Sequence, residues 1–106
     1  MERRKFIRVS VPLCVNFKIG DEKEEFRGVT RDISYGGVRL VMDDFKENLS
    51  PKPPIYSLEI LFPKQTFRFQ AQLVWVKQNT DKYEAGFYFL DLPQGFKEVI
   101  CNYLPF

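Results

Sequence analysis

Residues 67–89, FRFQAQLVWVKQNTDKYEAGFYF, decide the fold because two alternating apolar stretches flank a short polar turn. The apolar positions are Phe67, Phe69, Ala71, Leu73 and Trp75 in the first stretch and Tyr83, Ala85, Phe87 and Phe89 in the second. A period of two is that of a strand with one buried face, and residues 78–81 are turn formers. We therefore predict a β-hairpin. For Trp75, a place in the core is the favoured interpretation, and the alternative is a stacking role.

Four further stretches before this hairpin show the same alternation. They cover about residues 11–19, 26–33, 38–42 and 56–62. Pro12 lacks a backbone N–H, which places the first stretch at a sheet edge or at the beginning of a strand. Prolines also make residues 43–54 a loop. Six strands with one apolar face each predict an all-β fold, a closed or nearly closed six-stranded antiparallel barrel.

The apolar period changes after the last predicted strand. The spacing becomes that of one side of an amphipathic helix, at Phe96, Val99, Ile100, Tyr103 and Leu104. Asp91 lies near the expected cap, and Pro93 suits a first helical turn. We predict one short C-terminal helix over residues 92–105 that covers an open end of the barrel.

The length of 106 residues allows one domain. Within it we expect a flexible basic arm at residues 1–10, the barrel at 11–90 and the helix at 92–105. The net charge of +2 is too small to hold a long nucleic-acid polymer. The absence of histidine removes the commonest general base and the commonest zinc ligand. We therefore expect no enzyme, no metal site and no cofactor.

The cysteine content and the apolar runs indicate where the protein resides. Cys14 and Cys101 are far apart in the sequence and suit a reducing compartment. No run of about 18 apolar residues could span a membrane. The charged start at residues 1–5 is not followed by the apolar stretch of a signal peptide. We expect a cytoplasmic protein with no membrane insertion.

A basic run at the beginning of the sequence is the first candidate for binding. Arg4 and Arg8 are four positions apart, so a helical turn or an extended arm can present both to one ligand. A guanidinium grips phosphate with two hydrogen bonds, stacks on a purine and matches the O6/N7 edge of guanine. The alternative is a solvated charged tail, because short basic runs are common.

The second candidate is the turn at residues 32–37, DISYGG. Asp32 and Ser34 are two positions apart, so in an extended chain they point the same way. A carboxylate can accept hydrogen bonds from guanine N1 and N2, and a hydroxyl can donate or accept. The two glycines allow a positive φ and a close backbone approach. The alternative is a plain turn made of ordinary turn formers.

Two motifs thus follow each other, separated by one predicted strand. They are Arg4-x-x-x-Arg8 and Asp32-x-Ser34-x-x-Gly37. Together they resemble the signature of the PilZ domain family, RxxxR followed by (D/N)xSxxG. The stretches LVWV at 73–76 and AGFYF at 85–89 are similar to the family pattern as well. The resemblance implies a PilZ-like barrel that binds cyclic di-GMP, a bacterial second messenger, and a role in motility or biofilm formation.

The resemblance also implies which residues hold the ligand. They are Arg4 and Arg8 for phosphate and guanine, and Asp32, Ser34 and Gly37 for the other side of the ligand. Arg3 either stacks on a second ligand molecule, which gives two stacked molecules per chain, or lies in water. Arg31 and Arg39 flank the turn as surface charge or as added positive potential. Tyr35 is either exposed near the ligand or packed on the barrel rim.

Several classes of function compete for this sequence. The favoured one is a non-enzymatic receptor in which cyclic di-GMP orders the basic arm and changes the surface offered to an unidentified protein partner. The alternative is a ligand-independent interaction adaptor, for example in motility or type IV pilus assembly. A barrel for single-stranded nucleic acid is disfavoured by the low net charge. An enzyme is disfavoured because no nucleophile has a base nearby.

Overall fold

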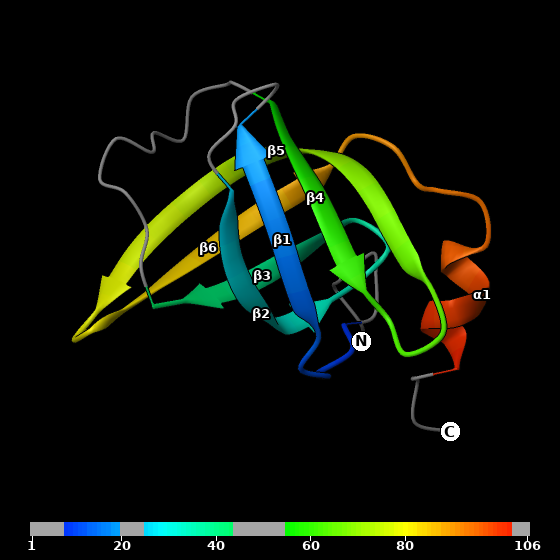
Figure 1. Cartoon of the computed structure of the whole chain (residues 1–106), viewed down its shortest axis with the longest axis horizontal. Coiled ribbons are helices and arrows are strands. Elements are labelled where there is room, and N and C mark those ends of the chain that lie inside the picture. Colours follow the sequence, from blue (N-terminus) through cyan, green and yellow to red (C-terminus); the bar gives the residue numbers. More distant parts are fainter. Residues whose placement is uncertain (1–7, 20–24, 44–54, 103–106) are drawn as a thin grey trace, which may run out of the picture.

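The computed structural model describes residues 8–19, 25–43 and 55–102. The elements in chain order are β1 (Cys14–Ile19), β2 (Phe26–Ile33), β3 (Gly37–Met42), β4 (Ile55–Leu61), β5 (Thr66–Asn79), β6 (Lys82–Phe89) and α1 (Phe96–Cys101). The strands form a closed barrel in the order β1-β2-β3-β6-β5-β4, and every neighbouring pair is antiparallel. Figure 1 shows the strands crossing around a common interior, with α1 at one side. The predicted fold, a six-stranded antiparallel barrel with one short helix, is confirmed.

Large aromatic side chains fill the interior of the barrel. Phe17 on β1, Tyr56 on β4 and Phe87 on β6 are buried and meet across it. Their ring centroids lie 5.3–6.2 Å apart in tilted and edge-on arrangements. Such pairs are favoured over flat stacking, because the ring edge is positive and the ring face is negative. The alternating apolar positions of the sequence therefore do face one common core.

Helix α1 is shorter than predicted and begins later. It starts at Phe96, with Gly95 as its N-cap at φ 89°, a left-handed conformation that glycine adopts without strain. Asp91, expected near the cap, instead accepts a hydrogen bond from the backbone N–H of Gln70 at 3.1 Å. Pro93 precedes the helix and accepts from the Phe96 N–H. The prediction of a helix from residue 92 is wrong, and residues 103–106 lie outside the described part.

Phe96 holds the helix against the barrel. Its ring is fully buried and contacts four other phenylalanine rings, those of Phe62, Phe67, Phe69 and Phe89. Phe62 and Phe67 flank the turn between β4 and β5. Ile100, one turn further along α1, is buried as well. The helix thus covers this end of the barrel (Figure 1).

The segment before β1 is tied to the barrel. Val9 and Ile33 exchange two backbone hydrogen bonds, from Val9 N–H to the Ile33 oxygen at 2.8 Å and from Ile33 N–H to the Val9 oxygen at 2.9 Å. The Val9 side chain is buried. The interpretation of residues 1–10 as an arm outside the core therefore does not hold at Val9. Residues 1–7, which include Arg3 and Arg4, lie outside the described residues.

A β-bulge in β5 changes the direction of the side chains after Leu73. Leu73 pairs with Phe87, but the next pair along the ladder is Trp75 with Gly86, so the register shifts by one residue. Ala85 and Phe87 point into the core, so Gly86 between them faces outward. Trp75 follows it to the outer face and is half-buried there. The prediction that Trp75 belongs to the barrel core is therefore wrong.

Candidate ligand-binding site

Five residues from separate parts of the chain form one row across the outer face of the barrel. Trp75 on β5 pairs with Gly86 on β6, Gly86 pairs with Arg39 on β3, and Arg39 pairs with Asp32 on β2. Arg8 completes the row through its hydrogen bond to Asp32. Antiparallel pairing of neighbouring strands is what aligns them, because paired residues lie side by side on one face.

The Asp32 carboxylate lies under two arginines. Arg8 Nη1 donates to Oδ1 at 2.8 Å, and Arg39 Nε donates to Oδ2 at 2.8 Å. Arg39 Nη2 also contacts Oδ2. The residue is 3% exposed, whereas the side chains of Arg8 and Arg39 keep 34% and 36% of their surface in contact with solvent. The carboxylate is thus buried and fully engaged, while both guanidiniums still reach water.

The charge balance at this cluster favours the ionised carboxylate. Burial of Asp32 raises its pKa, because a charge is costly away from water. The hydrogen bonds and positive charges of Arg39 and Arg8 outweigh that effect and bring the pKa below its usual value. In the same way, the hydrogen bond to Asp32 raises the pKa of Arg39. Two positive groups and one negative group leave this cluster with a net positive charge facing solvent.

The turn between β2 and β3 is held by Ser34 and Gly37. The Ser34 backbone N–H donates to the Gly37 oxygen at 2.9 Å, and the Gly36 N–H donates to Ser34 Oγ at 3.2 Å. A Cβ added to Gly37 would lie 2.2 Å from the backbone oxygen of Phe87, so only glycine fits where β3 approaches β6. Neither Gly36 nor Gly37 has a positive φ. Of the two reasons predicted for these glycines, close approach therefore applies at Gly37, and positive φ applies at neither.

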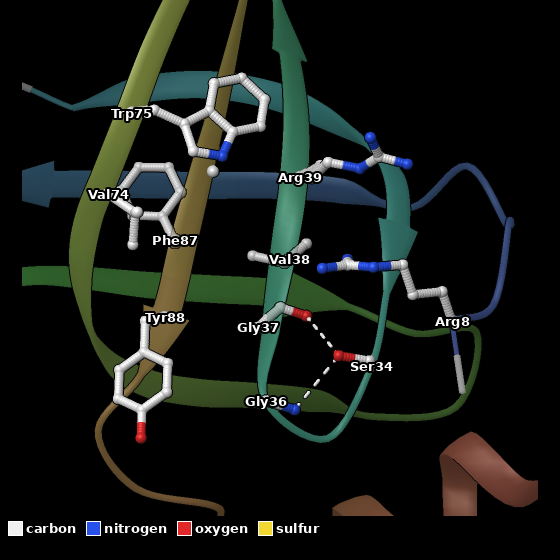
Figure 2. A pocket seen from close by; sticks show the side chains of 11 residues that line it. Arg8, Ser34, Gly36, Gly37, Val38, Arg39, Val74, Trp75, Phe87 and Tyr88 are labelled. Atoms are coloured by element: carbon white, nitrogen blue, oxygen red, sulfur yellow. Dashed lines mark hydrogen bonds between the residues drawn. The ribbon is translucent and has the colours of Figure 1, made fainter. Parts of the chain in front are cut away.

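A pocket of about 380 Å³ opens on this face. Its lining comprises Arg8, Ser34, Gly36, Gly37, Val38 and Arg39 on the side of β2 and β3, and Val74, Trp75, Gly86, Phe87 and Tyr88 on the side of β5 and β6. Figure 2 shows the arginines on one side and the indole and the Tyr88 ring on the other. The pocket therefore offers a cationic edge opposite an aromatic edge, which suits a ligand with both anionic and flat aromatic groups.

The structure gathers most of the predicted site residues. Arg8, Ser34 and Gly37 line the pocket, and Asp32 lies behind Arg8 and Arg39 as the group that holds them. Arg4 and Arg3 belong to residues 1–7 and lie outside the described part. Arg8 of the first motif and the residues of the second motif thus meet at one place on the barrel, although about one strand separates them in the sequence.

Arg39 and Trp75 line the pocket as well, although neither was among the predicted binding residues. The signal for Arg39 was present in the sequence, because Val38 and Leu40 alternate with it and face the core, so Arg39 must face outward. Strict alternation placed Trp75 in the core, and only the bulge moves it to the pocket. The sequence clue to the outward position of Trp75 is Gly86, because a glycine leaves room for the indole on the outer face.

Tyr35 connects the turn to helix α1 rather than to the pocket. Its hydroxyl lies 3.0 Å from Cys101 Sγ, and the Lys97 ammonium lies 5.7 Å from the centre of its ring. The contact with Cys101 raises the pKa of Tyr35. Of the two interpretations of Tyr35, packing on the barrel rim is the one that this arrangement favours.

Several solved structures share this fold. The inhibitor of motility MotI/DgrA from Bacillus subtilis has a TM-score of 0.79 at 20% identity over 97% of this chain, which spans 50% of that one. The PilZ domain of Escherichia coli YcgR with c-di-GMP has a TM-score of 0.76 at 19% identity over 94% of this chain and 87% of that one. The PilZ domain of CeSA from a cellulose-synthesizing bacterium has a TM-score of 0.66 at 14% identity over 91% of this chain and 92% of that one.

Among curated protein sequences, no significant relative matches this chain. In the described ranges, no helix has the length and apolar character needed to cross a membrane. The sequence profile of the PilZ domain matches residues 2–104, which is nearly the whole chain. This match, together with the closed six-stranded barrel, shows that the chain belongs to the PilZ domain family.

Proposed function

We propose that this protein is a non-enzymatic receptor for cyclic di-GMP. The observation that carries the proposal is the pocket in which Arg8, Ser34 and Gly37 lie beside Arg39 and opposite an aromatic edge. Membership of the PilZ family supports it, as does the c-di-GMP-bound PilZ domain of YcgR among the structural neighbours. The matching family, the PilZ domain, is not a family of enzymes, which also supports a non-enzymatic receptor.

The chemistry of the ligand matches the two edges of the pocket. Cyclic di-GMP has two phosphates and two guanines. A guanidinium has five N–H donors, and Arg8 uses one of them on Asp32, so others can reach a phosphate or the O6/N7 edge of a guanine. Arg4, four positions before Arg8, would add a second guanidinium from the same motif. Ser34 and the backbone at Gly37 would contact the other side of the ligand.

A calorimetric titration with cyclic di-GMP tests the receptor proposal. We expect saturable binding without turnover, weaker at higher salt because phosphates meet arginines. Arg8→Ala and Arg4→Ala should each weaken binding by about 1.5–3 kcal/mol, the scale of a charge-assisted hydrogen bond. Arg68→Ala is the matched control, since Arg68 is an exposed arginine paired with Glu59 on β4 and β5. A parent protein that does not bind would refute the function, and an Arg8→Ala protein that binds as the parent does would refute the site.

The number of ligand molecules depends on Arg3. If Arg3 stacks on a second molecule, calorimetry should give two ligands per chain, and Arg3→Leu should reduce that to one. One ligand per chain, unchanged by Arg3→Leu, would remove Arg3 from the site.

We further propose that the ligand passes the signal by ordering the N-terminal arm through Arg4 and Arg8. Val9 is fixed to Ile33, and Arg8 next to it lines the pocket. The arm and the exposed Val74 and Tyr88 would then form one surface for a protein partner. Hydrogen exchange should show residues 1–8 protected only when the ligand is bound. Equal protection in both states would exclude this mechanism but not binding.

The alternative function, a ligand-independent adaptor, has one supporting observation. Val74 and Tyr88 are 53% and 56% exposed and both line the pocket, so they offer an apolar surface that a protein partner could cover. An adaptor would show no saturable binding of cyclic di-GMP in the same titration. A single-stranded oligonucleotide that outcompetes the dinucleotide would instead support a nucleic-acid barrel.

A further inference from the structure

We propose that Trp75 is the stacking platform for one guanine of the ligand. The proposal rests on the receptor function above and deepens it, because it assigns the purine to a residue that neither sequence motif contains. Three features of the described residues lead to it, namely the bulge before Trp75, the glycine beside it, and its place opposite the arginines.

The bulge and the glycine together create the position of the indole. Without the register shift after Leu73, residue 75 would point into the core with Phe67 and Phe69. With it, the indole lies against Gly86 on the outer face. A Cβ at position 86 would be 2.4 Å from Nε1 and 2.5 Å from Cε2 of the indole, so glycine is the residue that allows this placement. A bulge beside a glycine is a feature that re-aims a side chain.

The position of the indole fits the geometry of a nucleotide. Trp75 and Arg39 are both cross-strand neighbours of Gly86, on its two sides. With strands about 4.8 Å apart, their backbones are about 10 Å apart. The indole lies over Gly86, whose lack of a side chain lets the ring extend towards Arg39. A purine on the indole would therefore lie beside the guanidinium of Arg39, which can take the adjoining phosphate. Figure 2 shows the indole of Trp75 and the guanidinium of Arg39 on opposite sides of β3.

Indole is the side chain best suited to this task. Every base has a flat π-face, and base–aromatic stacking contributes binding that does not depend on hydrogen-bond readout. The half-buried state of Trp75 means that the protein already holds the ring in place, so little conformational entropy is lost when a base stacks on it. The competing explanation is that the indole only covers the backbone at Gly86.

Trp75 is the single tryptophan of the chain, so its fluorescence reports this position directly. Cyclic di-GMP should change the emission along the same saturation curve that calorimetry records. Inorganic pyrophosphate, which has phosphates but no base, should leave the emission unchanged. Calorimetric binding with constant emission would overturn the platform and leave the receptor function standing. Absence of calorimetric binding would overturn both.

Substitutions separate stacking from surface packing. Trp75→Leu should weaken binding about tenfold, the effect of removing one base–aromatic stack, and Trp75→Phe should restore most of it. Gly86→Ala should also weaken binding, because the added Cβ displaces the indole while the tryptophan is retained. Tyr83→Leu is the matched control and should leave binding unchanged, because Tyr83 is a half-buried ring on β6 that does not line the pocket. A Trp75→Leu protein that is folded by circular dichroism and binds as the parent does would refute the proposal.

Discussion

Arg8 donates a hydrogen bond from Nη1 to Oδ1 of Asp32 at 2.8 Å, although the two residues are 24 positions apart in the sequence. This contact joins the second arginine of the first motif directly to the first residue of the second motif. Arg39 binds the other carboxylate oxygen. Asp32 therefore holds two guanidiniums at the edge of the pocket, and we propose that it serves ligand binding as a positioning residue.

Asp32→Asn should weaken both the fold and ligand binding. The amide keeps the size of the side chain but loses the charge that both arginines bind, and its NH₂ group faces one of them as a donor. We expect the free energy of unfolding to fall by about 1–3 kcal/mol, since the arginines are partly exposed. Urea denaturation measures this, and calorimetry should show weaker binding of cyclic di-GMP. Unchanged stability with lost affinity would instead make Asp32 a direct ligand contact.

The Asp32 cluster should make stability depend on pH in the acidic range. Because the folded pKa is lowered, ionised Asp32 stabilises the fold at pH values above 3.8, the usual value for this group. The stabilisation is lost as the pH falls through the lower folded pKa. The hydrogen bond from Arg68 lowers the pKa of Glu59 and acts in the same direction. The free energy of unfolding should therefore be measured against pH for the parent and for Asp32→Asn. The difference between the two proteins should shrink as the pH falls below 3.8. A difference independent of pH would contradict the charge argument.

Gly37→Ala should destabilise the protein strongly. The new Cβ would lie 2.2 Å from the Phe87 backbone oxygen, so β3 and β6 would have to separate. We expect a loss of about 2–3 kcal/mol in the free energy of unfolding, at the upper end for overpacking. Gly28→Ala is a milder control, because its Cβ would meet the Met42 side chain at 3.0 Å, which can move, and the Val41 oxygen at 3.1 Å. Equal losses for the two variants would show that the β3–β6 approach is not the critical contact.

Phe96→Ala should release helix α1 from the barrel. The substitution leaves a cavity between four phenylalanine rings, and such changes cost about 3–5 kcal/mol. Thermal denaturation should show the loss, and hydrogen exchange should be fastest in residues 96–101. Lys97→Ala, on the exposed side of the same helix, is the control and should change stability little. A Phe96→Ala protein as stable as the parent would mean that α1 does not belong to the cooperative core.

The barrel itself could be predicted from the sequence because its signal is local. Alternation of apolar residues follows from the pleat of each strand, so Phe67 and Phe69 reveal their face without knowledge of the partner strand. The two motifs are local as well, and Arg8 and Ser34 could be assigned to one ligand from their residue types and the family resemblance. These features depend on neighbours in the sequence, and the sequence contains them in full.

The remaining features depend on partners distant in the sequence. Val9 is held in the core by a pair of backbone hydrogen bonds to Ile33, and α1 is held against the barrel because four phenylalanine rings surround Phe96. Trp75 reaches the pocket because pairing with β6 tolerates an extra residue in β5 opposite Gly86. A one-residue shift moves a side chain from one face of a sheet to the other, and period alone cannot show it. The sequence thus determined the barrel and most of its candidate ligand residues, whereas the tertiary structure decided which aromatic side chain faces them.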